Sequence, residues 1–199
     1  MTIPELVGAQ RNFFNTGATR SIDFRIAQLK KFHIALQKNE PLLLSAIDAD
    51  LKKSRYDTFT SELSLVYREI SFMCRNIRRW SRKQRTLTNL VNFPGRSYRL
   101  AEPYGVTYIA GAWNYPYQLT LLPLVDALAA GNTAVVKPSE VAPRTSACWS
   151  QPTNSTLTQL EVNLTHDRST RDHRSTRRLS QPWNVTKPTD ATNLIVTPP

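Results

Sequence analysis

The most regular hydrophobic pattern in the chain lies in residues 59–80. Its apolar side chains recur at alternating steps of four and three: Phe59, Leu63, Val66, Ile70, Met73, Ile77 and Trp80. These steps return to the same face of an α-helix, because the helix has about 3.6 residues per turn. The pattern predicts one long helix packed on a neighbouring helix or sheet. A coiled coil is the less favoured alternative, because the flanking charges are poorly organised.

An earlier segment has the same helical period. In residues 19–39 the residues at the helical spacing are Ile22, Ile26, Leu29, His33 and Leu36. A second helix is expected to begin after Asn39 and to run to about Lys53. Pro41 would then lie in its first turn, where the missing N–H is tolerated.

The period changes near Leu90. Residues 90–105 contain two short extended segments around Pro94-Gly95, which predicts a hairpin arm at about residues 88–103.

After this arm, residues 106–112 resemble a buried strand, residues 117–130 an apolar helix ended by Gly131-Asn132, and residues 133–136 a second buried strand. A strand, a helix and a strand within so short a span form a βαβ unit with a parallel sheet.

Polar side chains follow both strands of this unit. Asn114 follows the first strand, and Lys137 and Glu140 follow the second. Ligands of open α/β sheets bind beyond the carboxyl ends of the strands. The Asn114 amide is therefore a candidate donor to a developing oxyanion, with capping of the next helix as the alternative. Lys137 and Glu140 are candidates to hold ribose hydroxyls, unless Ser139 or Glu140 simply begins a helix. The chain contains no G-x-G-x-x-G and no P-loop.

Composition narrows the class of protein. The chain has 199 residues, of which 40% are hydrophobic, enough for a real core. No run of apolar residues is long enough to span a membrane, so we expect a cytoplasmic protein. Cys74 and Cys148 lie far apart and lack metal-ligand spacing, which predicts no metal site. The net charge of +11 favours anionic partners only weakly, and no specific nucleic-acid binding is expected.

The segment "EPYGVTYIAGAWNYPYQLTLLPLVDALAAGNTAVVKPSEVAPRTSA", residues 102–147, strongly resembles the aldehyde dehydrogenase superfamily. The resemblance is to its shorter, class 3-like branch of fatty and aromatic aldehyde dehydrogenases. The upstream stretches "RSIDFRIAQLKKF" and "DADLKKS" fit that branch too, so the resemblance covers residues 1–147. It implies an incomplete α/β fold: an N-terminal helical layer, an oligomerisation arm and the first βαβ unit of a Rossmann-like cofactor-binding domain.

The resemblance also implies site residues and a reaction, the NAD(P)-dependent oxidation of an aldehyde to a carboxylic acid. By family pattern, Asn114 donates its amide to the oxyanion formed when a cysteine thiolate attacks the aldehyde. Lys137 and Glu140 would contact the adenosine ribose of NAD or NADP, and Trp113 would form part of the pocket wall. An anionic Glu140 disfavours the 2′-phosphate of NADP, but members of the branch often accept both cofactors, so the choice stays open.

The resemblance ends after Ala147. Residues 148–199 contain no glycine and no segment similar to those that carry the family's general-base Glu and nucleophilic Cys. Cys148 lies in the wrong context and too early to be that nucleophile. We expect a non-homologous, disordered tail and a sheet that stops after two strands, hence a marginally stable chain.

The first hypothesis is thus a truncated or frameshifted aldehyde dehydrogenase fragment that is inactive alone. The alternative is a non-catalytic interaction protein, in which the helical layer and the arm form a homodimer or pair with a full-length subunit.

Overall fold

The computed structural model describes residues 2–150, 162–164, 184–186 and 195–197. The chain divides into two compact units, residues 1–167 and residues 168–199. The second unit contains β6 (Asn184–Thr186) and β7 (Ile195–Thr197), which pair antiparallel. All other elements belong to the first unit. Its helices are α1 (Ile3–Asn15), α2 (Ile22–Leu51), α3 (Arg55–Thr58), α4 (Ser64–Trp80), α5 (Gln118–Ala130) and α6 (Pro143–Ser150). Short 3₁₀ turns lie at Ala18–Arg20 and Leu90–Asn92.

The sequence analysis did not predict helix α1. Its start nevertheless carries a recognisable signal, because Thr2 and Glu5 form a capping box in which each side chain accepts a hydrogen bond from the other's backbone N–H. Pro4 lies in the first turn, where proline is favoured.

The predicted break before Pro41 is wrong, because α2 continues through it from Ile22 to Leu51. A proline inside a helix costs about 3 kcal/mol, since it removes a hydrogen bond and crowds the preceding turn. Burial on both sides of Pro41 offsets that cost. Phe32, Leu36, Leu43 and Ile47 have no exposed surface, and they belong to one hydrophobic core.

The prediction that residues 59–80 are helical is confirmed. A π-helical turn at Phe59–Leu63 joins α3 to α4, so the chain is helical from Arg55 to Trp80. Val66, Ile70 and Ile77 of the apolar stripe are buried, whereas Phe59 and Trp80 are about 40% exposed. The stripe therefore packs fully only along its middle.

The predicted βαβ unit is present. Strands β3 (Val106–Ala110) and β4 (Thr133–Lys137) pair in parallel, with α5 between them in sequence. The expectation of a sheet that stops at two strands is wrong, because β5 (Val162–Leu164) pairs in parallel with β4. The strand order is β3-β4-β5, so β4 is central and its hydrogen-bonding groups are used on both sides over Ala134–Val136.

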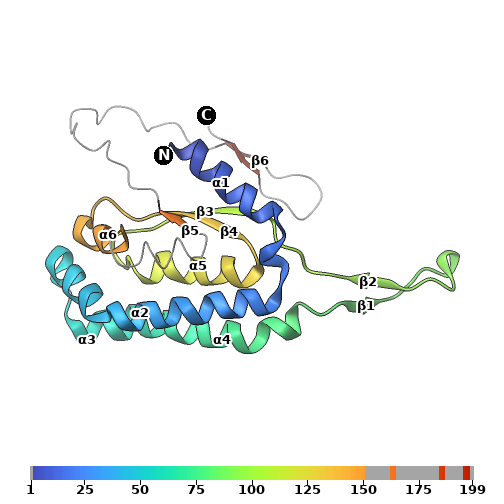
Figure 1. The fold of residues 1–199 in the computed structure, drawn as a ribbon, viewed down its shortest axis with the longest axis horizontal. Helices are drawn as coiled ribbons and strands as arrows, with labels where there is room; N and C mark the ends of the chain where they lie inside the picture. Colours follow the sequence, from blue (N-terminus) through green and yellow to red (C-terminus); the bar gives the residue numbers. More distant parts are fainter. Residues whose placement is uncertain (1, 151–161, 165–183, 187–194, 198–199) are drawn as a thin grey trace. The chain divides into compact units, whose positions relative to one another are not determined.

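The elements of the first unit stack in layers (Figure 1). Helix α1 lies on one face of the sheet and α5 on the other, with α2 and α4 beneath α5. The buried side chains of α2, α4, α5 and β4 form one continuous core. Helix α5 is the centre of this arrangement, because it packs on the sheet on one side and on the helical layer on the other.

The predicted hairpin arm is also present, but its first strand lies earlier than expected. Strand β1 (Gln84–Thr86) pairs antiparallel with β2 (Ser97–Arg99), so the arm begins before residue 88. The arm extends away from the helices (Figure 1). Its polar first strand has no apolar alternation, which explains why the pattern alone did not reveal it.

Gly131 ends α5 and lies against the Arg25 side chain of α2. Its φ of +90° lies in the left-handed region, and a Cβ there would lie 2.5 Å from Cζ of Arg25. Arg25 cannot easily move aside. Its guanidinium donates to the carbonyl oxygens of Thr19, Arg20 and Ala129, at 2.6, 3.2 and 3.4 Å.

We therefore predict that Gly131→Ala lowers the free energy of unfolding by about 2 kcal/mol, from backbone strain and loss of the Arg25 contacts. Urea unfolding followed by circular dichroism measures the change. Gly8→Ala is the matched control: a Cβ at Gly8, inside α1, meets nothing within 4 Å, so that change should be stabilising. Equal effects of the two substitutions would contradict this account.

Candidate functional site

The loops that follow β3 and β4 begin side by side at the carboxyl edge of the sheet. Ala110 is in register with Lys137, and the N–H of Gly111 donates to the carbonyl of Lys137 at 2.8 Å. The loop after β3 also passes close to α5, since a Cβ at Gly111 would lie 2.1 Å from Oγ1 of Thr120. Only glycine allows this approach. The two segments that carry Asn114 and Lys137 thus leave the sheet at the same edge.

Asn114 and Trp113 lie in the exposed part of the first loop, and Trp113 is 53% exposed. The alternative role of Asn114 as a helix cap is wrong. Helix α5 has Tyr117 at its N-cap position, and a different side chain receives its first N–H groups. The Asn114 amide is therefore not used to begin α5.

Glu62 is the residue that caps α5. Its Oε2 accepts hydrogen bonds from the N–H groups of Tyr117 and Gln118, at 2.8 and 3.3 Å. Its Oε1 lies 2.7 Å from Nζ of Lys53, and the Glu62 side chain is completely buried. A carboxylate is favoured at a helix N-terminus because the helix dipole is positive there. The carboxylate thus has partners on both oxygens.

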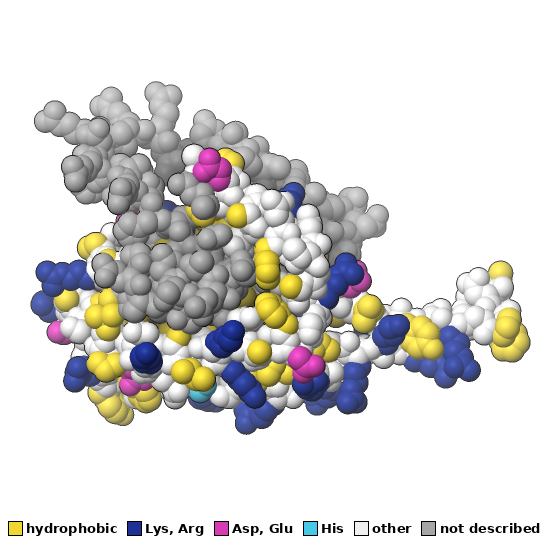
Figure 2. Space-filling model, viewed as in Figure 1, with side chains coloured by type: hydrophobic (Ala, Val, Ile, Leu, Met, Phe, Trp, Pro, Cys, Tyr) yellow, Lys and Arg dark blue, Asp and Glu magenta, His cyan; other side chains and the backbone are white. Residues whose placement is uncertain are grey.

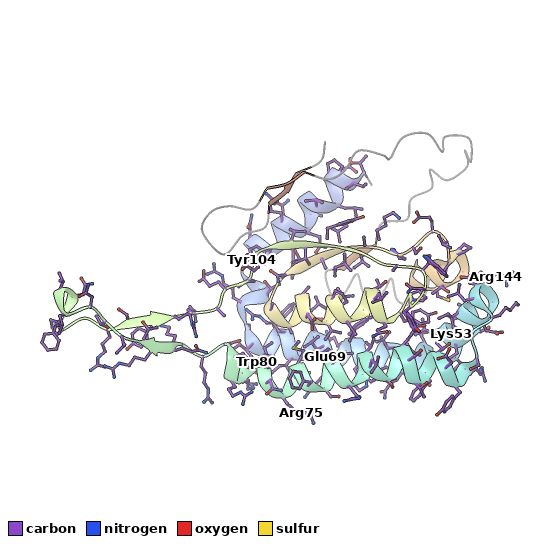
Figure 3. All side chains as sticks on the ribbon, turned by 180° about the vertical axis from the view of Figure 1, so that it is seen from behind. Lys53, Glu69, Arg75, Trp80, Tyr104 and Arg144 are labelled. Carbon is purple, nitrogen blue, oxygen red and sulfur yellow. The ribbon has the colours of Figure 1, made fainter. Side chains whose placement is uncertain are left out.

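Lys53 connects this pair to the loop. Its ammonium lies 4.2 Å from the centre of the Tyr115 ring, in cation–π geometry, and the Lys53 side chain is 11% exposed. Figure 3 shows Lys53 at the end of the helical layer where α5 begins. Tyr115, next to Asn114, is thereby held against the helical layer.

Tyr117 anchors the end of the loop. Its side chain is fully buried, and its hydroxyl donates to the carbonyl of Leu43 at 2.7 Å. Burial, followed by the nearby Cys148, Glu62 and Asp50, raises the pKa of Tyr117 well above its ordinary value. The hydroxyl therefore stays protonated and keeps its hydrogen bond. The loop is fixed at Gly111, Tyr115 and Tyr117, and it presents Trp113 and Asn114 between these points.

The second loop brings Lys137 and Glu140 together. Lys137 Nζ lies 2.5 Å from Glu140 Oε2, and the two side chains are 30% and 54% exposed. Neither Ser139 nor Glu140 begins a helix, so that alternative is wrong: α6 begins at Pro143. The Ser139 hydroxyl instead accepts a hydrogen bond from Val141 N–H at 3.3 Å.

Asp50 occupies the N-terminus of α6. Its two oxygens accept hydrogen bonds from the N–H groups of Arg144 and Thr145, at 3.2 and 2.7 Å. Carboxylates of the helical layer thus cap both helices that begin at this edge of the sheet. A phosphate group would find these two N-termini already occupied by negative charge.

The arrangement fits the ribose end of a dinucleotide better than its pyrophosphate. An ammonium and a carboxylate side by side offer a donor and an acceptor to a vicinal diol, and Lys137 and Glu140 are accessible enough to do so. Within residues 2–150 we find no glycine-rich phosphate cradle. Groups that bind a pyrophosphate would therefore have to lie outside residues 2–150.

Neither cysteine has the properties of a nucleophile. Cys148 is buried in α6, and burial, together with Asp50, raises the pKa of its thiol. Burial also raises the pKa of Cys74, although nearby Lys30 acts in the opposite direction. A reactive cysteine requires a lowered pKa. Among the described residues, no group of His, Cys, Asp and Glu side chains could hold a metal ion.

A surface groove of about 660 Å³ runs along α4 and the start of α5. Leu65, Phe72 and Leu122 supply apolar surface, while Arg68, Glu69 and Arg75 add charge. Gln118, four residues after Asn114, also lines the groove. The groove therefore adjoins the loop that carries the candidate oxyanion donor.

Sequence reasoning missed Glu62, Lys53 and Asp50. A signal for Glu62 was available, because it lies three residues after Phe59 and four before Val66, on the face of the apolar stripe. A carboxylate at an apolar position requires a buried partner. Lys53 and Asp50 carried no comparable signal, since their partners are remote in sequence.

Comparisons with known proteins identify the family of the chain. Residues 2–153 match the model of the aldehyde dehydrogenase family, so the chain belongs to that family. The match extends six residues beyond the boundary at residue 147 that the sequence analysis expects.

Individual relatives support the class 3-like branch. The chain is 38% identical over 145 residues to 4,4'-diaponeurosporen-aldehyde dehydrogenase of Staphylococcus aureus, covering 73% of this chain and 32% of the relative. It is 42% identical over 131 residues to aldehyde dehydrogenase family 3 member B1 of Homo sapiens, covering 66% and 28%. The solved substrate-bound state of Staphylococcus aureus AldH superposes with a TM-score of 0.79 at 33% identity, covering 83% and 36%.

The chain thus spans about a third of the length of the relatives that it matches, and it corresponds to an N-terminal portion of them. The resemblance to class 3 aldehyde dehydrogenases and the incomplete α/β fold are both confirmed. In the part of the chain that the structure describes, no helix is long and apolar enough to cross a membrane.

The buried pair yields a stability prediction. Glu62→Gln removes the charge that balances Lys53, and we expect it to lower the free energy of unfolding by about 3 kcal/mol. The double variant Lys53→Met/Glu62→Gln should recover part of that loss, because it leaves no unpaired buried ammonium. Urea unfolding of the wild type, both single variants and the double variant gives the coupling energy. Strictly additive effects would contradict the proposed pairing.

Proposed function

We propose that residues 1–147 form the N-terminal part of an NAD(P)-dependent aldehyde dehydrogenase. The last helix of this part, α6, runs to Ser150. Residues beyond 153, where the family match ends, would lie outside the homologous region. The observation that carries this proposal is the parallel pairing of β3 and β4, because it brings the Asn114 loop and Lys137 to one edge. Family membership supports the reaction class.

In this proposal Asn114 is the oxyanion donor. When a thiolate attacks an aldehyde, the carbonyl oxygen gains negative charge, and a preorganised amide N–H stabilises that charge. The loop suits this role because Gly111, Tyr115 and Tyr117 are each fixed. A fixed donor needs little reorganisation when the charge develops.

Lys137 and Glu140 would hold the adenosine ribose of NAD or NADP, with Trp113 as part of the pocket wall. The nicotinamide would supply the hydride acceptor. The Glu140 carboxylate would repel a 2′-phosphate and the Lys137 ammonium would attract it, so the choice between NAD and NADP stays open. The pair at 2.5 Å supports the assignment, since both groups already face each other at the sheet edge.

The aldehyde would approach along the α4–α5 groove. The groove offers apolar surface from Leu65, Phe72 and Leu122, and it ends beside the Asn114 loop at Gln118. An apolar aldehyde chain suits this surface. Neither described cysteine suits the role of the nucleophile, because burial raises the pKa of both. We therefore expect no turnover from this chain alone.

Joining residues 1–147 to the remaining part of the Staphylococcus aureus relative should give a chimera that oxidises aldehydes. In it, Asn114→Ala should lower kcat about 10²–10³-fold, because one oxyanion donor is lost. The KM for the aldehyde should change little. Asn76→Ala, on α4, is the control. An Asn114→Ala chimera with full kcat would contradict the assignment.

A second candidate function is pairing with a full-length subunit. It is favoured by the open α4–α5 groove, which retains the exposed apolar side chain of Phe72. A tagged form of this chain should then co-purify with an untagged full-length class 3 subunit. If the two chains do not co-purify while the chimera that retains Asn114 oxidises aldehydes, the pairing hypothesis is contradicted. Only the dehydrogenase-fragment proposal then stands.

A further inference from the structure

The α4–α5 groove carries basic side chains as well as apolar ones. Arg68 and Arg75 of α4 line it, and Phe72 lies between them in the sequence. Both arginines are exposed, and among the described residues neither forms an ion pair or a side-chain hydrogen bond. Arg78 of the same helix differs, because it pairs with Asp23 of α2. Two guanidinium groups of the groove thus have all their donors available to a ligand.

The apolar and basic residues follow the length of the groove. They recur along α4 at steps of three, four and three: Leu65, Arg68, Phe72 and Arg75. Residues at these steps are neighbours on the surface of a helix. Leu65 comes about one turn after Glu62, which caps the start of α5, so it lies at the end of the groove nearest the Asn114 loop. Arg75 lies about 15 Å further along the helix axis, at a rise of about 1.5 Å per residue.

One carboxylate also lines the groove, that of Glu69. It lies on the same helix as Arg75 (Figure 3). Glu69 is close to Asp126 of α5, because burial first, and then the Glu69 charge, raise the pKa of the Asp126 carboxyl. Asp126 itself lines a different pocket. The walls of the groove therefore carry two cationic side chains and one anionic side chain, and their net charge is positive.

Positive charge alone does not mark a site on this protein. Figure 2 shows Lys and Arg side chains at many places on the face that it displays, as the net charge of +11 leads one to expect. The groove differs because its arginines stand at a hollow of about 660 Å³ whose walls include Leu65, Phe72 and Leu122. A ligand that enters such a hollow displaces water from the guanidinium groups, which strengthens their attraction for an anion.

We propose that the groove selects aldehydes that carry a carboxylate at the far end of an apolar chain. The inference rests on the proposed function, in which the aldehyde group lies at the Asn114 loop. The apolar chain lies against Phe72 and Leu122, and the terminal carboxylate reaches Arg75, with Arg68 nearer the middle of the chain. The two arginines determine specificity in this account, because they contact a part of the substrate that does not react.

A carboxylate suits these residues better than a phosphate or an uncharged end. The planar fork of a guanidinium matches both carboxylate and phosphate groups. A phosphate monoester carries close to two negative charges at neutral pH, so Glu69 on the same wall repels it about twice as strongly as a carboxylate. A methyl end gains nothing from either arginine. The groove therefore discriminates between aldehydes by the charge at the end remote from the reaction.

The direct test is ligand binding to the full chain, which requires no turnover. Isothermal titration calorimetry compares nonanoate with nonanol, which share an apolar chain and differ in the charge at one end. We expect nonanoate to bind about tenfold more tightly, at the low end of the range for a hydrogen bond to a charged group, because the groove is open to water. Added salt should weaken the binding of nonanoate and leave that of nonanol unchanged.

Variants assign this preference to the groove. Arg75→Gln should remove most of it and Arg68→Gln part of it, with nonanol binding unchanged. Glu69→Gln should strengthen nonanoate binding about threefold, because it removes a repulsive charge from the wall. Phe72→Ser should weaken both ligands alike. Lys38→Gln, at an exposed basic position of α2 outside the groove, is the matched control and should bind both ligands like the wild type. Circular dichroism checks that each variant is folded.

The chimera with the Staphylococcus aureus relative tests the same specificity in turnover. Nonanal is compared with the half-aldehyde of azelaic acid, which has the same chain with a carboxylate in place of the methyl group. Arg75→Gln should raise the KM for the half-aldehyde about tenfold with little change in kcat, because it removes binding that the substrate and the transition state share. Neither constant should change for nonanal.

The possible results separate this inference from the proposed function. Equal binding of nonanoate and nonanol, or a preference that the Arg68 and Arg75 variants leave unchanged, overturns the inference and leaves the proposed function in place. Tighter binding of nonyl phosphate than of nonanoate overturns the choice of a carboxylate. A chimera that oxidises no aldehyde contradicts the proposed function and, with it, the claim that the groove selects a substrate, even if nonanoate still binds at Arg75.

Discussion

The geometry of the candidate site depends on one buried carboxylate, that of Glu62. It joins three parts of the molecule that are remote in sequence: the end of α2 through Lys53, the π-helical turn that precedes α4, and the N-terminus of α5. A buried charge is unfavourable unless it is paired and fully hydrogen bonded. Glu62 meets that condition only when all three parts are in place. The pair therefore specifies a geometry more than it adds stability.

A consequence is that the helical layer determines what the sheet edge can bind. Glu62 and Asp50 cap α5 and α6, so the positive ends of both helices are neutralised by the protein itself. The polar groups left accessible at this edge include the Asn114 amide and the Lys137–Glu140 pair. These are suited to an oxyanion and to a diol, and they are poorly suited to a phosphate. This chemistry supports the proposed role of the edge as part of a dehydrogenase site, in a chain that spans about a third of the length of its relatives.

Much of this fold was predictable from local pattern. The apolar stripe of residues 59–80, the βαβ unit and the Gly131 stop are signals carried within a few turns of chain, and the structure confirms each of them. The positions of Asn114 and Lys137 at one edge followed from the parallel sheet. The local sequence pattern could not predict the effects of packing between residues that are remote in sequence. The helix α2 passes through Pro41 because its buried face continues on both sides, and β5 joins β4 from beyond the family-like segment. The partners of Glu62 lie nine and fifty-five residues away, so no local rule could identify them.

Amide hydrogen exchange at the start of α5 tests this account most directly. If Glu62 holds the loop as described, the N–H groups of Tyr117 and Gln118 should exchange as slowly as those in the middle of α5, although the first N–H groups of a helix normally lack an intrahelical partner. The preceding residues, around Trp113 and Asn114, should exchange quickly. Fast exchange at Tyr117 and Gln118, equal to that of Asn114, would show that the carboxylate does not fix the loop, and the proposed site would lose its physical basis.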